Sequence, residues 1–391
     1  MKTYQTTKDS GTAWLGDVPS DWQLKRVGVL FRQRNEKVSD KDYAPLSVTK
    51  NGIVPQLEDA AKSNDGDNRK LVLKGDFVIN GRSDRRGSSG LSDLDGSVSL
   101  INTVLADGKL YPRYAHNLLR SYPFQEEFYR WGQGIVADLW STNYQRMKAI
   151  LLPVPDGETQ ERIAAYLDEE TALIDELIAK QQHLLELLAE KRRATITRAV
   201  INDSWPREKI KYIATKRDQK VKATKDVPYI GLEHVESSSG KRIESEAQSE
   251  PEGLTLGYNA GDVLFGKLRP YLAKVLLTSD SGVCSSEFIV LKATDKLLPE
   301  FLKYSLLNEQ FIELINSSTY GAKMPRANWD FIGNATLALP PLDKQKQIVD
   351  RIEQQERLTD QLKQRILKQI DLLKERRTSL VSSAVTGKFK V

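Results

Sequence analysis

Two long stretches of the chain repeat apolar residues every three or four positions among charged ones. They lie near residues 157–200 and 343–385. This spacing places the apolar side chains on one face of a helix and is typical of a coiled coil. Polar Gln181 and Gln369 interrupt the two apolar seams. The predicted seam residues are Ile163, Leu167, Ile174, Leu177, Leu184 and Leu188 in the first stretch and Ile348, Ile352, Leu362, Ile366, Leu373 and Leu380 in the second.

Proline marks the start of each helix, because its ring is not tolerated in a helix interior. Pro155 with Asp156, and Pro340 with Asp343, therefore predict two helix starts with the aspartates as N-caps. A helix of about 43 residues is roughly 65 Å long at 1.5 Å per residue. One small domain cannot bury that length, so we expect the two helices to pair antiparallel as a rigid spacer. The alternative is two unrelated amphipathic helices, each packed on its own domain.

The two stretches belong to a longer internal repeat. A shift of 185 residues places Gln160 on Gln345 without a gap. Upstream, DWQLKRVGVLFRQRNEKV at 21–38 matches SWPREKIKYIATKRDQKV at 204–221, and KGDFVING matches AGDVLFGK. Self-similarity over such distances indicates that one structural unit is present twice. The chain therefore reads as a globular part followed by a long helix, written two times.

The globular parts read as mixed helix and strand. KLVLKGDFVING and NAGDVLFGKLRPYLAKVLL predict strand-turn-strand units with Gly-Asp at the corner, and VSLINTVLA and SSEFIVLKA predict further strands. PRYAHNLLRSYPFQEEFYRW and PEFLKYSLLNEQFIELINSS have helical periodicity after a proline. We therefore predict an α+β fold in which two mixed α/β domains are separated by two long helices forming an antiparallel coiled coil, with an internal pseudo-two-fold duplication. The expected boundaries are 1–153 and 202–338 for the domains and 154–201 and 339–391 for the helical spacers.

Composition limits the class of protein only partly. The single Cys284 excludes a disulfide framework and is typical of a reducing cytoplasm. The first residues contain no apolar signal segment, and no apolar run has the length of a membrane span. We therefore expect a cytoplasmic protein. The net charge of +5 and the pI of about 8.9 favour an acidic partner only weakly, so the position of the basic residues has to decide.

Basic residues gather in loops of both globular parts. NGRSDRRGSSG holds three arginines, and FGKLRPYLAK holds three cations without an acid. Lysine and arginine neutralise phosphates, and arginine and asparagine also read base edges. A solvated basic loop explains either segment alone, but matching positions in two duplicated domains favour DNA. The predicted DNA-binding residues are Arg82, Arg85, Arg86, Ser88, Asn143, Tyr144, Lys267, Arg269, Tyr271, Tyr320, Lys323, Arg326, Asn328 and Trp329.

The apolar stripe on the long helices is wider than one coiled-coil seam. Leu185, Leu187, Ile370 and Leu372 add apolar surface beyond the seam positions. Exposed apolar surface of this extent usually marks an interface. We expect partner subunits to bind there, and two similar helices predict two similar sites.

Catalytic motifs are missing from the sequence. His116, His183 and His234 are far apart, and there is no HExxH or CxxC spacing for zinc. There is no GxxxxGK[ST] or GxGxxG loop, and no Asn-Pro-Pro-aromatic segment of an adenine methyltransferase. Asp-x-Lys occurs at 107–109 and 218–220, but this tripeptide is common in charged chains. We therefore expect no catalytic residue, metal site or cofactor in this chain.

These features together resemble the specificity subunit of a Type I restriction-modification enzyme. WLGDVPSDWQLKRV is similar to the start of a target recognition domain in that family. The two Pro-x-x-x-x-Gln-x-x-Ile helix starts, and the helix ends EKRRATITRAV and KERRTSLVSSAVTGK, are similar to those of its helical spacers. The resemblance covers nearly the whole chain and keeps the order of parts. The loops of the two domains differ strongly, so individual base contacts cannot be transferred.

The resemblance implies a non-catalytic subunit whose two target recognition domains each read half of an asymmetric, bipartite DNA site. It implies two methyltransferase (modification) subunits on the helical spacer, joined by restriction subunits. Adenine-N6 methylation with S-adenosylmethionine, and cleavage with ATP and Mg, would belong to those partners.

If the two domains face one DNA duplex, we expect the half-sites to lie roughly 34–36 Å apart, about one helical turn. Two alternatives stay open: a DNA-modifying enzyme with unrecognised motifs, and a coiled-coil adaptor that does not touch DNA.

Overall fold

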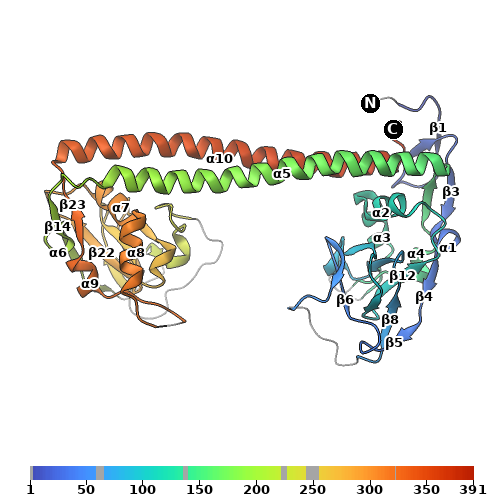
Figure 1. Cartoon of the computed structure of the whole chain (residues 1–391), viewed down its shortest axis with the longest axis horizontal. Helices are drawn as coiled ribbons and strands as arrows, with labels where there is room; N and C mark the ends of the chain where they lie inside the picture. Colours follow the sequence, from blue (N-terminus) through green and yellow to red (C-terminus); the bar gives the residue numbers. More distant parts are fainter. Residues whose placement is uncertain (1–2, 59–65, 135–139, 222–226, 244–254, 322) are drawn as a thin grey trace. The chain divides into compact units, whose positions relative to one another are not determined.

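A computed structural model describes residues 3–58, 66–134, 140–221, 227–243, 255–321 and 323–391 (Figure 1). The chain divides into two compact units. Unit 1 comprises Met1–Lys180 and Gln369–Val391, and unit 2 comprises Gln181–Lys368. Both long helices thus contribute residues to both units. The domain and spacer boundaries expected from the sequence treat the helices as separate parts, and they stay predictions.

Unit 1 is built from short strands and short helices. Its largest sheet is antiparallel, with the order β10-β9-β12-β4, and a second sheet has the order β11-β8-β5. The strands β1 and β2, β6 and β7, and β3 and β13 form two-stranded pairs. The strands are β1 Thr7–Asp9, β2 Asp17–Pro19, β3 Gln23–Arg26, β4 Arg32–Arg34, β5 Lys37–Val38, β6 Leu46–Thr49, β7 Gly52–Pro55, β8 Arg69–Val72, β9 Phe77–Asn80, β10 Ser89–Leu91, β11 Gly96–Val98, β12 Asn102–Ala106 and β13 Leu151–Val154. The helices are α1 Val27–Leu30, α2 Pro112–Arg120, α3 Tyr122–Arg130 and α4 Tyr144–Met147.

Unit 2 repeats this arrangement. Its largest antiparallel sheet has the order β20-β19-β22-β15, a second sheet has the order β16-β18-β21-β17, and β14 pairs with β23. The strands are β14 Arg207–Lys209, β15 Ala214–Arg217, β16 Lys220–Val221, β17 Tyr229–Ile230, β18 Thr255–Tyr258, β19 Val263–Gly266, β20 Val275–Leu277, β21 Gly282–Ser285, β22 Phe288–Ala293 and β23 Thr336–Ala338. The helices are α6 Ile210–Ile213, α7 Pro299–Leu307, α8 Glu309–Ser317 and α9 Trp329–Asn334.

The duplication inferred from sequence is confirmed by this equivalence of strands. A charged pair recurs with it: Arg34 pairs with Asp76 at 2.8 Å in unit 1, and Arg217 pairs with Asp262 at 2.7 Å in unit 2. Both aspartates are buried, and each follows the glycine of a Gly-Asp corner. Gly-Asp lies between two strands in each unit, but β8 and β9 belong to different sheets, and so do β18 and β19. The predicted hairpins at these two corners are therefore wrong, although β19 does pair with the following β20.

The two long helices are α5 (Gly157–Val200) and α10 (Leu342–Val385), which confirms both predictions within one residue. Asp156 caps α5, because its carboxylate accepts the N–H of Thr159 at 2.9 Å. Asp343 is not the cap of α10. That helix begins one residue earlier, so Asp343 lies inside its first turn, where the carboxylate faces the positive end of the helix dipole.

Within unit 1, the first part of α5 runs antiparallel to the last part of α10. The rings of Tyr166 and Phe389 are in contact, and farther along α5 Asp175 pairs with Arg377 at 2.8 Å. Ile163, Leu167, Ile174 and Leu380 are buried in the core of this unit. The predicted seam residue Leu177 is instead 47% exposed.

Within unit 2, the last part of α5 runs against the first part of α10. Ile348 and Ile352 are buried with Ile196 in the core, and Arg192 pairs with Glu356 across the two helices. Leu184 and Leu362 are exposed, contrary to the seam assignment. A strict seven-residue repeat drifts around a straight helix of 3.6 residues per turn, so a seam extrapolated by heptads leaves the contact face. Since α5 and α10 contribute to the cores of both units, they are not helices packed on one domain each.

Candidate nucleic-acid interface

The basic loop of unit 1 follows β9 and contains the short helix η1 (Ser83–Arg85). It is held by the segment that precedes α4. Arg82 and Ser141 form an isolated antiparallel bridge, and the N–H of Ser83 donates to the carbonyl of Trp140 at 2.9 Å. The two segments are separate in sequence but lie side by side in the unit.

The basic loop of unit 2 follows β19 and is held in the same way. The bridge recurs between Leu268 and Arg326, and the N–H of Arg269 donates to the carbonyl of Pro325 at 2.7 Å. We call the segments 131–144 of unit 1 and 318–329 of unit 2 the closing segments. A second bridge folds each of them on itself, from Gln133 to Ser141 in unit 1 and from Tyr320 to Arg326 in unit 2. The sequence predicted both basic loops and, apart from them, site residues in both closing segments. The structure brings each basic loop next to the closing segment of its unit. Residues 135–139 and 322 of the closing segments lie outside the described residues.

The arginines of unit 1 are exposed but not equally free. Arg82 and Arg85 share Asp84, at 3.0 and 3.7 Å, while Arg86 pairs with Glu126 at 2.9 Å. Arg85 has the longest of these contacts and the most exposed side chain, 68%. Exposed ion pairs contribute at most about 1 kcal/mol, so a phosphate can readily replace them. Arg85 is therefore the residue of this loop best placed to meet DNA.

Tyr129 packs against the basic loop of unit 1. Its hydroxyl donates to the carbonyl of Asn80 at 3.1 Å, and the guanidinium of Arg86 lies 5.2 Å from its ring centre. Burial raises the pKa of Tyr129 to about 12, so the hydroxyl keeps its proton and its donor role. Ser88 is only 6% exposed, so its hydroxyl is not presented to a ligand, and we withdraw it from the candidate surface.

Unit 2 offers a different set of side chains at the equivalent place. Arg326 forms a two-pronged pair with Glu287, at 2.9 and 3.2 Å. Lys267, Arg269 and Lys323 form no ion pair within the part of the chain that the structure describes. Tyr271 of the basic loop and Tyr320 of the closing segment are also exposed. Unpaired cations and exposed aromatic rings suit phosphates and bases, respectively.

The backbone of this loop is strained at two positions. Arg269 and Ala273 adopt left-handed conformations, with φ of 50° and 46°. Lys274 holds the second position, because its ammonium donates to the carbonyls of Leu232 and Val235 at 2.7 and 2.9 Å. Such strain is common where a loop is shaped for a ligand. Lys274, one of the three cations of FGKLRPYLAK, thus uses its ammonium to hold the shape of the loop.

Four predicted site residues start short helices. Asn143 and Asn328 are the N-caps of α4 and α9, and each side chain accepts a backbone N–H of the first turn. Tyr144 donates its hydroxyl to a carbonyl at 2.8 Å and packs against the core of unit 1, and Trp329 packs against that of unit 2. These contacts fix where the closing segments lie. A direct role of the four residues in DNA binding stays a prediction.

The structure sorts the candidate partner surface into exposed and buried residues. Leu187 and Leu372 are exposed and Leu185 is half-buried, but Ile370 is only 4% exposed and belongs to the core, so we withdraw it from that surface. Leu177 and Leu362 are also exposed, although the sequence predicted them in the seam. Leu173 and Leu358 are exposed too and were not predicted as site residues. Three exposed leucines of the long helices in unit 1 each have an exposed counterpart 185 residues away in unit 2. The leucine set of unit 1 is Leu173, Leu177 and Leu372, and the leucine set of unit 2 is Leu358, Leu362 and Leu187.

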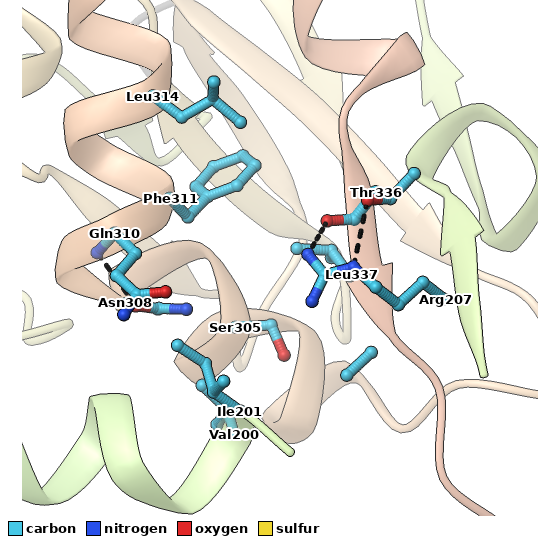
Figure 2. Close-up of a pocket in the computed structure, with 11 residues that line it drawn as sticks. Val200, Ile201, Arg207, Ser305, Asn308, Gln310, Phe311, Leu314, Thr336 and Leu337 are labelled. Atoms are coloured by element: carbon cyan, nitrogen blue, oxygen red, sulfur yellow. Dashed lines mark hydrogen bonds between the residues drawn. The ribbon is translucent and has the colours of Figure 1, made fainter. Parts of the chain in front are cut away.

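A pocket of 150 Å³ in unit 2 is lined differently from the basic candidate interface (Figure 2). Phe311 and Leu314 give it an apolar wall, and the buried Ser305 hydroxyl has no hydrogen-bond partner among the described residues. Arg207 is its only cation, and its guanidinium donates to Thr336 at 3.2 and 3.1 Å, as the dashed lines in Figure 2 show. With that charge engaged, the pocket is poorly suited to a nucleic-acid backbone.

Catalytic chemistry finds no support in the described residues. No three His, Cys, Asp or Glu side chains there are placed to hold a metal ion. The aspartates of both Asp-x-Lys tripeptides pair with neighbouring cations, Asp107 with Arg32 at 2.6 Å and Asp218 with Lys216 at 2.7 Å. No described helix has the length and apolar content needed to cross a bilayer.

Comparison with known proteins gives a family match in the second half of the chain. Residues 203–372 match the family described as the Type I restriction modification DNA specificity domain. The specificity subunit of the Type I restriction enzyme EcoDI from Escherichia coli is 24% identical over 281 residues, 62% of this chain and 62% of that protein. The specificity subunit of the Type I restriction enzyme MjaVIII from Methanocaldococcus jannaschii is 30% identical over 132 residues, 33% of this chain and 26% of that protein. The match spans less than two thirds of either relative, and it confirms the resemblance seen in the sequence.

Solved structures support the fold of the chain. A chain from a type I R-M system, studied for its complex assembly and conformational transition, has a TM-score of 0.69 at 15% identity, covering 94% of this chain and 98% of that chain. The HsdS subunit from Thermoanaerobacter tengcongensis has a TM-score of 0.54 at 17% identity, with coverages of 95% and 98%. At such identities the likeness concerns the fold alone, and it agrees with the predicted mixture of helix and strand with two long helices.

Proposed function

We propose that this chain, whose residues 203–372 carry a Type I restriction modification DNA specificity domain, reads a bipartite DNA site for a Type I restriction-modification complex. The observation that carries the proposal is the interface built twice. In unit 1 the basic loop after β9 is bridged to the segment before α4. In unit 2 the basic loop after β19 is bridged to the segment before α9. A loop pair held by backbone contacts can change its side chains without losing its shape.

The two interfaces differ in the groups that they present. Unit 1 presents arginines shared with acids, and unit 2 presents unpaired cations and exposed tyrosines. Base edges are distinguished by the donors and acceptors of individual side chains, so unlike loops read unlike sequences. The target is therefore an asymmetric site with one half for each unit. Phosphate contacts would position each unit and would make binding sensitive to salt.

The chain itself recognises DNA and leaves catalysis to partners. Modification subunits would supply adenine-N6 methylation with S-adenosylmethionine, and restriction subunits would supply cleavage with ATP and Mg. The leucine sets of units 1 and 2 are similar surfaces, and two of them suit two modification subunits. A complex that acts on chromosomal DNA places the protein in the cytoplasm.

Mapping methylated adenines in the host genome tests the proposal. Deleting the gene should abolish methylation at one asymmetric, two-part motif, and restoring it should bring that motif back. Methylation that persists unchanged would contradict the proposal. The two alternatives give other signatures: purified chain that modifies or cleaves DNA alone would be an enzyme, and a complex whose DNA footprint does not depend on this chain would contain an adaptor.

A further inference from the structure

A polar pocket in unit 1 has no role in the proposed DNA reading. It has a volume of 280 Å³ and lies among α2, α3 and the last part of α10. Its volume far exceeds the roughly 30 Å³ of one water molecule. The lining includes two arginines and no acidic residue. The polar lining residues that matter below are His116, Arg120, Ser121, Tyr122 and Arg377.

Arg120 is a cation without a carboxylate partner in this pocket. Its guanidinium donates to the carbonyl of Lys50 and lies 3.2 Å from Nε2 of His116. Burial, and then the positive charge of Arg377, lower the pKa of Arg120. No acid among the described residues offsets these two effects. A half-buried guanidinium keeps its charge, and an unpaired charge away from bulk water favours a counter-anion.

His116 offers a second hydrogen-bond donor to an anion in this pocket. The N–H of Leu91 donates to Nδ1 of His116 at 3.2 Å. Burial, and then nearby arginines, lower the pKa of His116 to about 4, so the ring is neutral and has one acceptor nitrogen. The Leu91 N–H and the Arg120 guanidinium face the two ring nitrogens at the same distance of 3.2 Å, and neither group can accept a hydrogen bond. We assign Nδ1 as the acceptor of the backbone N–H, which places the proton on Nε2. Nε2–H and the guanidinium of Arg120 are then two donors 3.2 Å apart, and an oxygen lying to the side of the pair would accept from both.

The duplicated position in unit 2 shows what unit 1 lacks. Arg192 of unit 2 stands 185 residues before Arg377, and it pairs with the half-buried carboxylate of Glu356. The same shift relates Glu356 to Thr171, which is a neutral residue. Unit 2 thus neutralises its arginine internally, whereas unit 1 has only Asp175, which lies on an exposed side of Arg377 at 2.8 Å. The internal acid has no counterpart at the pocket of unit 1.

Helix α3 adds favourable polarity. Its N-terminal residues Ser121 and Tyr122 line the pocket, so the positive end of its dipole faces the same space as Arg120. Three independent groups, a cation, a helix terminus and a histidine N–H, therefore converge on one volume.

We propose that this pocket binds a phosphate-class oxyanion, held by Arg120, the Nε2–H of His116 and the start of α3. The phosphate is either a free ion or small phosphomonoester, or a phosphodiester of nucleic acid, and the chemistry of recognition is the same. The proposal does not depend on the DNA-reading function, because the binding of free phosphate can be measured without DNA.

Isothermal titration of the full chain with inorganic phosphate, at constant ionic strength, tests the proposal. The wild type and the control Arg113→Lys, which keeps the positive charge near His116, should bind one phosphate with equal affinity. Arg113 lies on the same helix but pairs with Asp168 and does not line the pocket. Arg120→Gln should weaken binding at least tenfold. Thr171→Glu supplies the acid of unit 2 and should have the same effect, so it tests the proposal if Arg120→Gln fails to fold.

Histidine resonances give an independent reading, because the chain has only three histidines. Phosphate should shift the ring signals of His116, whose proton should be on Nε2, and leave His183 and His234 unchanged. A DNA duplex that competes with phosphate in the wild type identifies a phosphodiester as the ligand, and a duplex that does not compete identifies free phosphate. The proposal is overturned if the wild type shows no saturable phosphate binding, or if both variants bind as tightly as the wild type.

Discussion

Gln160 and Gln345 make the same two hydrogen bonds in two different units. In each case the amide oxygen accepts the N–H of the residue that precedes a short helix, Tyr111 or Leu298, at 2.8 Å. The amide nitrogen donates at 2.8 Å to the carbonyl of the proline at the start of the long helix. Both glutamines are buried. They join the long helices to the globular parts, which explains why the repeat retains glutamine at this place.

Replacing one of these glutamines should destabilise its unit. Gln345→Leu keeps the volume but leaves the N–H of Leu298 without its partner, which costs about 1–3 kcal/mol. Gln347→Leu is the control, because this glutamine lies on the same helix and is exposed. Urea unfolding of the two variants measures the difference. Equal stability of both would show that the buried amide bonds contribute nothing.

The cap of α5 predicts a dependence on pH. Hydrogen bonds from the backbone and side chain of Thr159 lower the pKa of Asp156. A lowered pKa gives stability that is present above the unfolded value and is lost as the pH falls through the folded value. Asp156→Ala should therefore cost about 1 kcal/mol at pH 7, and the difference from wild type should shrink in acid. Asp343→Ala, which removes an acid from inside a first turn, should cost less at pH 7.

The corrected seam of unit 1 can be tested with two residues on one helix. Ile174 is buried, whereas Leu177 is exposed. Ile174→Ala should cost about 2–5 kcal/mol because it leaves a cavity. Leu177→Ala should change the stability by less than about 0.5 kcal/mol. The reverse order in denaturant unfolding would restore the heptad assignment.

The leucine sets predict where partners bind. Leu187→Glu and Leu372→Glu should each weaken assembly with modification subunits about tenfold or more, since each buries a charge in an apolar interface. The free chain should remain folded, because both residues are exposed. Ile370→Glu should instead unfold unit 1. Native mass spectrometry of the complex and circular dichroism of the free chain separate the two effects, and unchanged stoichiometry in the first two variants would argue against these surfaces.

Sequence periodicity and repetition predicted much of this architecture. The bounds of α5 and α10 followed from proline and aspartate at the helix starts, and the duplication followed from matched segments such as those around Gln160 and Gln345. Tertiary packing decided the rest. Leu177 was predicted in the buried seam and is exposed, whereas Ile370 was predicted on the partner surface and is buried. Heptad spacing misses this because the side of each helix that is buried depends on its packing against a globular core. Residue type predicted a binding role for Asn143, but its side chain caps α4.

Charge in the sequence located the candidate interface without showing which of its side chains are free to bind. Three arginines marked the loop of unit 1, yet the acids that occupy them come from within the loop and from α3. Trp140 and Met324 are exposed on the closing segments and were not selected, because an aromatic or a methionine in a loop carries no distinctive pattern. Only the backbone bridges show that these residues lie beside the basic loops.

The central claim is that each unit reads its own half of one site, and footprinting tests it most directly. The complex is assembled with wild-type chain, Arg85→Ala or Lys267→Ala, and the protection of a DNA fragment containing the methylated motif is compared half by half. The account predicts that Arg85→Ala weakens protection of one half and Lys267→Ala that of the other, with a loss of about 1–3 kcal/mol wherever a base edge is contacted. Weakening of the same half by both variants, or undiminished protection in both, would contradict it.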